Sequence, residues 1–284
     1  MNNIRIELGI PILYTLERYR KRHDSNWATS VVAYFSSMLR DYMWIPIYIF
    51  LVTDGPFLFQ LSGLLLHLLA FSIIYEAGYL YTDNISVKKE NVKIRKVIYK
   101  EALQENHVYF AMLLRVIVVG IMFLFMQPWL SLEIIILYLS ILAIYYIYGN
   151  LQESYRVPLF LLLRFLKGFI PVSFLLLSLE SVPTTLISLL LLATASFFTI
   201  EYASRKLDLP YINIQLMKYV WVRYLIIFVF LAPYLIFDHI PFRDFSLIFT
   251  TYVSIHIGMI VLSLLRKFLN VFIIKELKSI LRIF

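Results

Sequence analysis

The sequence predicts an all-α fold, a polytopic membrane bundle of eight to nine transmembrane helices around a central cavity that faces the cytoplasm. The first observation is composition: 61% of the 284 residues are hydrophobic and 15% are charged, with a mean hydropathy of +0.79. Soluble domains carry roughly 45–50% apolar and about 25% charged residues. The second observation is that long apolar runs recur, and a spanning helix needs about 20 apolar residues. The third is that lysine and arginine gather on alternate connections.

Eight apolar runs are long enough, or nearly so, to cross a membrane. They lie between turns rich in proline, such as "TDGP", "MQPWLS" and "DHIPFRD". The first run is short and extends if the helix begins near Trp27. The predicted spans are 42–54, 58–82, 107–127, 130–148, 157–178, 183–203, 217–237 and 245–265.

Basic segments flank this transmembrane domain, which covers residues 42–265. Residues 1–41 contain "IPILYTLERYRKRH", a mixture of apolar and basic residues that is typical of an amphipathic helix on an anionic membrane surface. Residues 266–284 form a similar basic amphipathic tail or a short ninth helix. There are no cysteines, which excludes disulfides, thiol nucleophiles and cysteine metal ligands.

The positive charges are distributed very unevenly between the two sides of the predicted bundle. Of the 26 lysines and arginines, 21 lie in connections or termini on one side, and only Arg243 lies on the other. This bias places the first side in the cytoplasm, with both termini inside and the protein in the cytoplasmic membrane. The net charge of +8 therefore needs no nucleic acid to explain it.

The four remaining cations lie inside predicted spans, each within about a dozen residues of the cytoplasmic end: Arg115, Arg164, Lys167 and Arg223. A central cation costs roughly 2.5–3.5 kcal/mol on insertion scales. One interpretation is that the side chains reach back to the headgroups. The other is a cavity whose cations hold an anion, for which phosphate suits guanidinium and ammonium groups.

Acidic residues are expected at the same depth. In "YEAGYLYTDNISVKKE", Glu76, Asp83 and Glu90 recur every seven residues, and "EYASRKLD" places Glu201 seven residues before Asp208. The acids and cations could simply pair with one another. Alternatively, the carboxylates could bind Mg²⁺ together with a substrate diphosphate, because Mg²⁺ prefers a few carboxylates plus phosphates.

These residues resemble the UbiA superfamily of intramembrane prenyltransferases. That family carries an N-D-x-x-D-x-x-x-D motif on the second helix and a D-x-x-x-D motif near the sixth. "TDNISVKKE" is similar to the first motif, with Asp83 on its first Asp, Glu90 on its last acid, Thr82 for the Asn and Ser86 for the middle Asp. "EYASRKLD" falls at the second motif, and "LRDYMW" resembles the start of the family's first helix.

The resemblance implies an Mg²⁺-dependent transferase that moves an isoprenyl group from a diphosphate donor to a lipid-soluble or aromatic acceptor. One subgroup instead transfers phosphoribose from phosphoribosyl diphosphate to polyprenyl phosphate. Catalytic acids would be Asp83, Glu76 and Glu201, with Glu90 and Asp208 as further metal ligands. Substrate phosphates would be bound by Arg164, Lys167, Arg115, Arg223, Lys88, Lys89, Arg95, Arg40 and Arg156.

Two other classes of function remain open at this point. A lipid-phosphate transporter would need charges or broken helices that continue into the outer half of the membrane. A non-catalytic relative would fit the serine at position 86. The five histidines have no metal-ligand spacing, and His67 falls in the outer half. The sequence indicates no oligomeric state.

Overall fold

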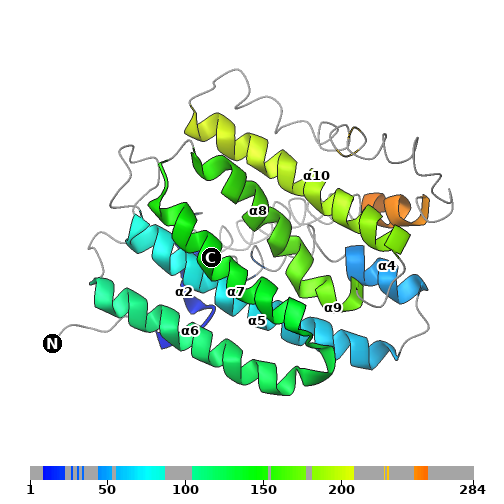
Figure 1. Cartoon of the computed structure of the whole chain (residues 1–284), viewed down its shortest axis with the longest axis horizontal. Coiled ribbons are helices and arrows are strands. Elements are labelled where there is room, and N and C mark those ends of the chain that lie inside the picture. Colours follow the sequence, from blue (N-terminus) through cyan, green and yellow to red (C-terminus); the bar gives the residue numbers. More distant parts are fainter. Residues whose placement is uncertain are drawn as a thin grey trace, which may run out of the picture.

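The chain is a bundle of long helices in a computed structural model (Figure 1). The structure describes residues 9–22, 27, 31, 34, 44–52, 56–86, 104–152, 155–176, 181–207, 227, 229 and 246–254. Every regular element within these ranges is a helix, and no strand occurs there. The predicted all-helical class is therefore confirmed for the described part of the chain.

Five helical segments in the described residues are long and apolar enough to cross a membrane. They agree with the second to sixth predicted spans to within a few residues. They are α5 (Phe57–Asn84), α6 (Glu105–Phe125), α7 (Leu132–Asn150), the segment Arg156–Leu176 and α10 (Ser181–Lys206). The protein is thus a helical membrane protein.

The remaining predicted spans are described in part or not at all. The first corresponds to α4 (Trp44–Val52), whose nine residues rise about 14 Å and so reach about half of the bilayer's hydrocarbon core. Residues 217–237 lie outside the described residues except for two helical positions, Ile227 and Val229. Residues 246–254 are helical, whereas the rest of the eighth span and the tail 266–284 lie outside the described residues.

α5 is the central helix of the described bundle. It packs against α6 and α7, and α8 (Arg156–Phe169) in turn packs between α7 and α10. Figure 1 shows these long helices side by side, with α6 and α10 at opposite edges. The ends of α5 and α7 at Asn84 and Asn150, together with the start of α6 at Glu105, lie at one end of the bundle, here named the Asn84 end.

At the end of the bundle opposite the Asn84 end, a proline follows α6 and a serine precedes α7. After α6, Pro128 lies in the 3-10 turn η2 (Gln127–Trp129), where its missing N–H is tolerated. α7 then begins after Ser131, whose side chain accepts a hydrogen bond from the Ile134 amide at 3.4 Å. Serine at this position satisfies one of the amides that the first helical turn leaves unpaired.

The spanning segment Arg156–Leu176 is interrupted at Pro171. α8 passes into the 3-10 turn η4 (Ile170–Val172) and then into α9 (Ser173–Leu176). Proline removes a backbone donor and crowds the preceding turn, which explains the break. The residues of η4 are buried against α5 and α7, so the interruption lies inside the bundle, where irregular backbone is tolerated in membranes.

Glycine allows α5 and α7 to approach closely. A Cβ placed on Gly78 would lie 2.0 Å from a ring atom of Tyr145 on α7, and one on Gly149 would lie 2.3 Å from a ring atom of Tyr81. Tyr145 is buried and makes an edge contact with Tyr75, with ring centroids 5.2 Å apart. Small residues at such crossings are characteristic of packed membrane helices.

α6 presents an apolar stripe away from its neighbours. The exposed members follow each other at intervals of three or four residues, which is the spacing of one helix face. This is the surface expected of a helix that faces lipid tails rather than water. The stripe consists of Phe110, Leu113, Ile117, Ile121 and Leu124.

Candidate functional site

The N-terminal helix α2 (Leu13–Arg22) packs on α5. Tyr14, Thr15 and Glu17 are buried, so this helix belongs to the bundle as well as being basic and amphipathic. The sequence suggested only an interfacial helix here. Its buried face brings Arg18 and Tyr14 to the acids of α5.

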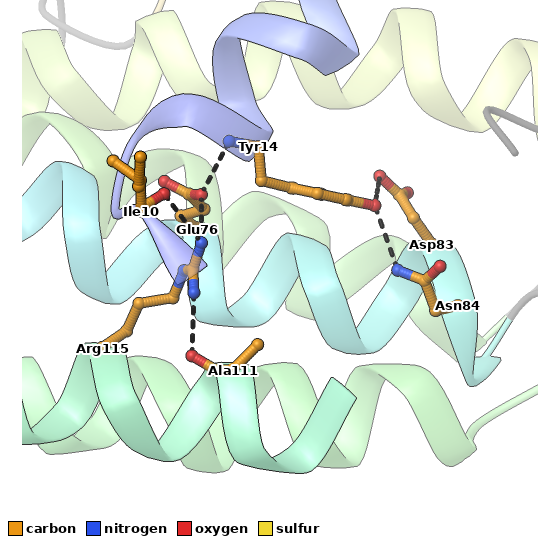
Figure 2. A network of polar contacts seen from close by, with 7 residues as sticks. All are labelled: Ile10, Tyr14, Glu76, Asp83, Asn84, Ala111 and Arg115. Carbon is orange, nitrogen blue, oxygen red and sulfur yellow. Dashed lines mark hydrogen bonds and ion pairs between the residues drawn. The ribbon is translucent and has the colours of Figure 1, made fainter. Parts of the chain in front are cut away.

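Asp83 forms the first polar contact between α2 and α5. Arg18 Nε lies 2.6 Å from Asp83 Oδ2, and the Tyr14 hydroxyl donates to the same oxygen at 3.4 Å. The Asn84 side-chain amide donates to the Tyr14 hydroxyl at 3.1 Å (Figure 2). The Arg18 and Asp83 side chains are 17% and 4% exposed, so the pair is largely shielded from water.

The charge on Arg18 is stable in this setting. Burial alone lowers the pKa of the Arg18 guanidinium, but Asp83, Tyr79 and Tyr14 together outweigh it and the net pKa is raised above its ordinary value. The guanidinium therefore stays protonated and remains able to bind an anion.

Glu76 and Arg115 form a second, deeper contact with the same segment. Arg115 Nη2 donates to Glu76 Oε1 at 2.8 Å, and both side chains are fully buried. The Tyr14 amide donates to the same oxygen at 3.1 Å. Arg115 also donates to the carbonyl oxygens of Ala111 at 2.9 Å and Ile10 at 3.3 Å (Figure 2). The ion-pairing interpretation, left open by the sequence, holds for these two residues.

A small pocket lies against α5, next to Lys167. Its volume is about 10 Å³, roughly the space of one water molecule. We call it the Lys167 pocket. Its lining residues come from α2, α5, α8 and position 34: Thr15, Tyr34, Phe71, Ser72, Tyr75, Tyr79 and Lys167.

Positive charge converges on the tyrosines of this pocket. Lys167 Nζ lies 5.7 Å from the centre of the Tyr75 ring, and Arg18 Cζ lies 4.1 Å from the centre of the Tyr79 ring. The charges of Lys167, Arg18, Arg164 and Asp83 all interact with Tyr79. The structure thus brings Lys167 and Arg18 to the tyrosines of this pocket, and Asp83 contacts Arg18.

Arg164 lies at the α8–α10 interface. Its guanidinium lies over Phe160 at 5.1 Å and over Phe198 of α10 at 4.8 Å. Glu201 is half-buried on α10, three residues after Phe198 and hence on a neighbouring part of that helix face.

Arg156 is placed apart from the Lys167 pocket. It is buried at the start of α8, where it donates to the Leu151 carbonyl at 2.8 Å and the Gly149 carbonyl at 3.4 Å. These bonds satisfy carbonyls at the end of α7, a structural use of arginine near a helix C-terminus. The other predicted site residues lie outside the described residues: Arg40, Lys88, Lys89, Glu90, Arg95, Asp208 and Arg223.

The carboxylates that could hold Mg²⁺ are only partly described. Within the described ranges, no three histidine or acidic side chains come close enough to form a metal site. Glu76 is bound to Arg115, and Asp83 contacts Arg18. A full ligand set would therefore need Asp83 together with Glu90 or Asp208.

His67 lies on α5 one turn before Phe71 and is not among the residues that line the Lys167 pocket. Its Nδ1 is 3.0 Å from the Tyr138 hydroxyl, its Nε2 is 3.4 Å from the Trp129 carbonyl, and its ring stacks on Phe174 with centroids 4.6 Å apart. The side chain is fully buried. These contacts account for His67 as a packed, hydrogen-bonded residue.

Arg18 was the residue missed by sequence reasoning. It lies in a run of four cations that alone indicates a membrane surface. The available signal was its spacing: Tyr14 and Arg18 are four residues apart and share one face. No family model, curated protein or solved structure matches the chain.

Proposed function

We propose that the chain is a membrane-embedded transferase that binds a diphosphate donor at the Lys167 pocket and releases diphosphate. The observation that carries this proposal is the approach of Arg18 to the Tyr79 ring at 4.1 Å and of Lys167 to the Tyr75 ring at 5.7 Å, with Asp83 beside Arg18 and Arg164 on the same helix as Lys167. Three cations within a largely apolar bundle are costly. An anionic substrate group would offset that cost.

The tyrosines suit the same chemistry. In the transfer step the bond between the donor carbon and the diphosphate oxygen breaks, and the electron pair leaves with diphosphate. Arg18, Arg164 and Lys167 would stabilise the negative charge that develops there. The Tyr75 and Tyr79 rings would face a cationic donor carbon, which aromatic faces attract. The acceptor then forms the new bond and loses its proton.

The donor class follows from the resemblance described above. We place an isoprenyl diphosphate first, with a lipid-soluble or aromatic acceptor that arrives from the bilayer, and phosphoribosyl diphosphate with polyprenyl phosphate second. Mg²⁺ is part of this proposal, with Asp83 as a ligand beside Glu90 and Asp208. When bound, the metal would neutralise diphosphate charge. The pocket would open to the cytoplasmic side.

The test is turnover by the purified protein in lipid nanodiscs. Labelled isoprenyl diphosphate or phosphoribosyl diphosphate is supplied with quinone-precursor or polyprenyl-phosphate acceptors, and diphosphate release is measured with Mg²⁺ and with EDTA. We expect Asp83→Asn to reduce turnover by at least about a hundredfold, because it removes a carboxylate from the site. EDTA should abolish turnover of the wild type.

The matched control is Glu133→Gln. Glu133 is an exposed acid in the first turn of α7, at the end of the bundle opposite Asn84, and its substitution should leave turnover unchanged. Full activity of Asp83→Asn contradicts the role of that acid. Movement of a phosphorylated lipid across the bilayer without diphosphate release would favour a transporter instead.

A further inference from the structure

Arg18 lies between an acid and the Lys167 pocket. We propose that Arg18 binds the phosphate of the anionic substrate, and that the Asp83 carboxylate is a placeholder which this phosphate displaces. The proposal rests on the proposed function for the choice of diphosphate as the anion. It assigns a binding role to the N-terminal helix and gives Asp83 a second role.

One guanidinium contacts both Asp83 and the ring of Tyr79, which lines the pocket. Arg18 Nε is 2.6 Å from Asp83 Oδ2, while Arg18 Cζ is 4.1 Å from the ring centre of Tyr79. Tyr79 and Thr15, which lies three residues before Arg18, both line the Lys167 pocket. A small rotation of the Arg18 side chain would therefore exchange the carboxylate for an anion in the pocket.

Carboxylate and phosphate can replace each other as hydrogen-bond acceptors of the Arg18 guanidinium. Carboxylate and phosphate oxygens accept the same N–H donors of guanidinium, so one can replace the other without a change of protonation. No covalent bond changes. A diphosphate at the pocket gains the charge of Lys167, which lines it, as well as that of Arg18, whereas Asp83 is a single negative charge.

Asp83 would not be left without contacts after the exchange. The Tyr14 hydroxyl also donates to Asp83 Oδ2, and Asn84 in turn donates to Tyr14. Because these groups lie on α2 and α5, the carboxylate stays in place next to the bound substrate. It is then positioned for the metal role described above.

The pocket volume is consistent with such an exchange. At about 10 Å³, the Lys167 pocket has no room for a diphosphate, so at least one neighbouring side chain must move when a substrate binds. Arg18 belongs to a helix of only ten residues and is 17% exposed. Lys167, in contrast, is buried in the long segment Arg156–Leu176.

The experiment measures binding of inorganic diphosphate to the protein in nanodiscs, with EDTA and at fixed ionic strength. We expect Arg18→Gln to weaken binding about tenfold or more, because a hydrogen bond to a charged group is lost. Arg20→Gln is the matched control on the same helix. Arg20 is bound to Glu17 at 2.6 Å and is 38% exposed, so its loss should leave the affinity unchanged.

The Asp83→Asn variant tests the direction in which diphosphate affinity changes. If Asp83 competes with phosphate for Arg18, removing its charge should tighten metal-free binding by about fivefold or more, because the competing acceptor beside Arg18 loses its charge. Misfolding cannot produce opposite effects in Arg18→Gln and Asp83→Asn. Wild-type affinity in Arg18→Gln, or weaker binding in Asp83→Asn, overturns the proposal.

The result separates this inference from the proposed function. Binding with the expected pattern, in a protein that transfers nothing from either donor class, supports Arg18 and contradicts the transferase. Turnover by the wild type together with unchanged diphosphate affinity in Arg18→Gln supports the transferase and contradicts the role of Arg18. No metal-free binding of diphosphate by the wild type overturns the role of Arg18 and leaves the transferase to be decided by the turnover measurement with Mg²⁺.

Discussion

At the scale of single residues, Glu76 and Asp83 have different tasks although both lie on α5. They are seven residues apart, about 10 Å along the helix. Glu76 is enclosed by Arg115 and the Tyr14 amide, whereas Asp83 contacts Arg18 beside the Lys167 pocket. We therefore expect Glu76 to hold the N-terminal segment in place and Asp83 to take part in substrate binding.

A double-mutant cycle tests the role of Glu76. Glu76→Met leaves the buried Arg115 without the Glu76 charge and should lower the free energy of unfolding by about 3–5 kcal/mol. Combining it with Arg115→Met removes both charges and should recover most of this loss. The measurement is thermal unfolding in detergent. Additive losses in the double variant would contradict a direct pair.

The sequence was sufficient to predict some of these residues but not their partners. The charges of Arg115, Arg164 and Lys167 stand out because cations inside apolar runs are costly. Arg18 does not stand out, since it lies 65 residues from Asp83 in the chain and in a segment that is basic throughout. Contacts over such a separation depend on how helices pack, which hydropathy does not encode.

At the scale of elements, the close approach of α5 and α7 positions the tyrosines of the pocket. Gly78 lies against the ring of Tyr145, and Tyr145 makes an edge contact with Tyr75. The spacing of these two helices therefore fixes one wall of the Lys167 pocket.

We expect Gly78→Ala to push α5 away from α7. The new Cβ would lie 2.0–2.4 Å from atoms of the Tyr145 ring, and overpacking of this kind costs about 1–3 kcal/mol. Both thermal stability and diphosphate affinity should fall. Gly120→Ala is the control, because nothing lies within 4 Å of a Cβ at that position on α6. Equal behaviour of the two variants would argue against a tight α5–α7 crossing.

Hydropathy predicted the long elements well and the irregular ones poorly. The five spanning segments from α5 to α10 coincide with apolar runs of the sequence, because a helix that spans the membrane needs about 20 apolar residues. The break at Pro171 and the nine residues of α4 depend on local backbone chemistry. The packing of α2 depends on tertiary contacts.

At the scale of the whole molecule, the charge asymmetry predicts one orientation in the membrane. α6 connects the two sides: its 21 residues rise about 31 Å, close to the thickness of the hydrocarbon core. Gln104 precedes this helix at the Asn84 end, and Gln127 follows it at the other end. Both side chains are exposed.

Single cysteines at these two positions test the orientation without background, because the chain has no cysteine of its own. With a membrane-impermeant maleimide, Gln127→Cys should be labelled in intact cells. Gln104→Cys should be labelled only after the cells are opened, since the positive-inside rule places it in the cytoplasm. The reverse pattern would invert the proposed topology, and labelling of both in intact cells would contradict a spanning α6.

The contacts of the N-terminal segment also set an order of assembly. Ile10 accepts a hydrogen bond from Arg115, a residue that lies 105 positions later in the chain. During synthesis the first residues leave the ribosome long before α6 exists. The N-terminal segment must therefore wait outside its final place until α5 and α6 have both inserted. The part of the protein that is made first therefore completes its contacts only after two later helices are in place.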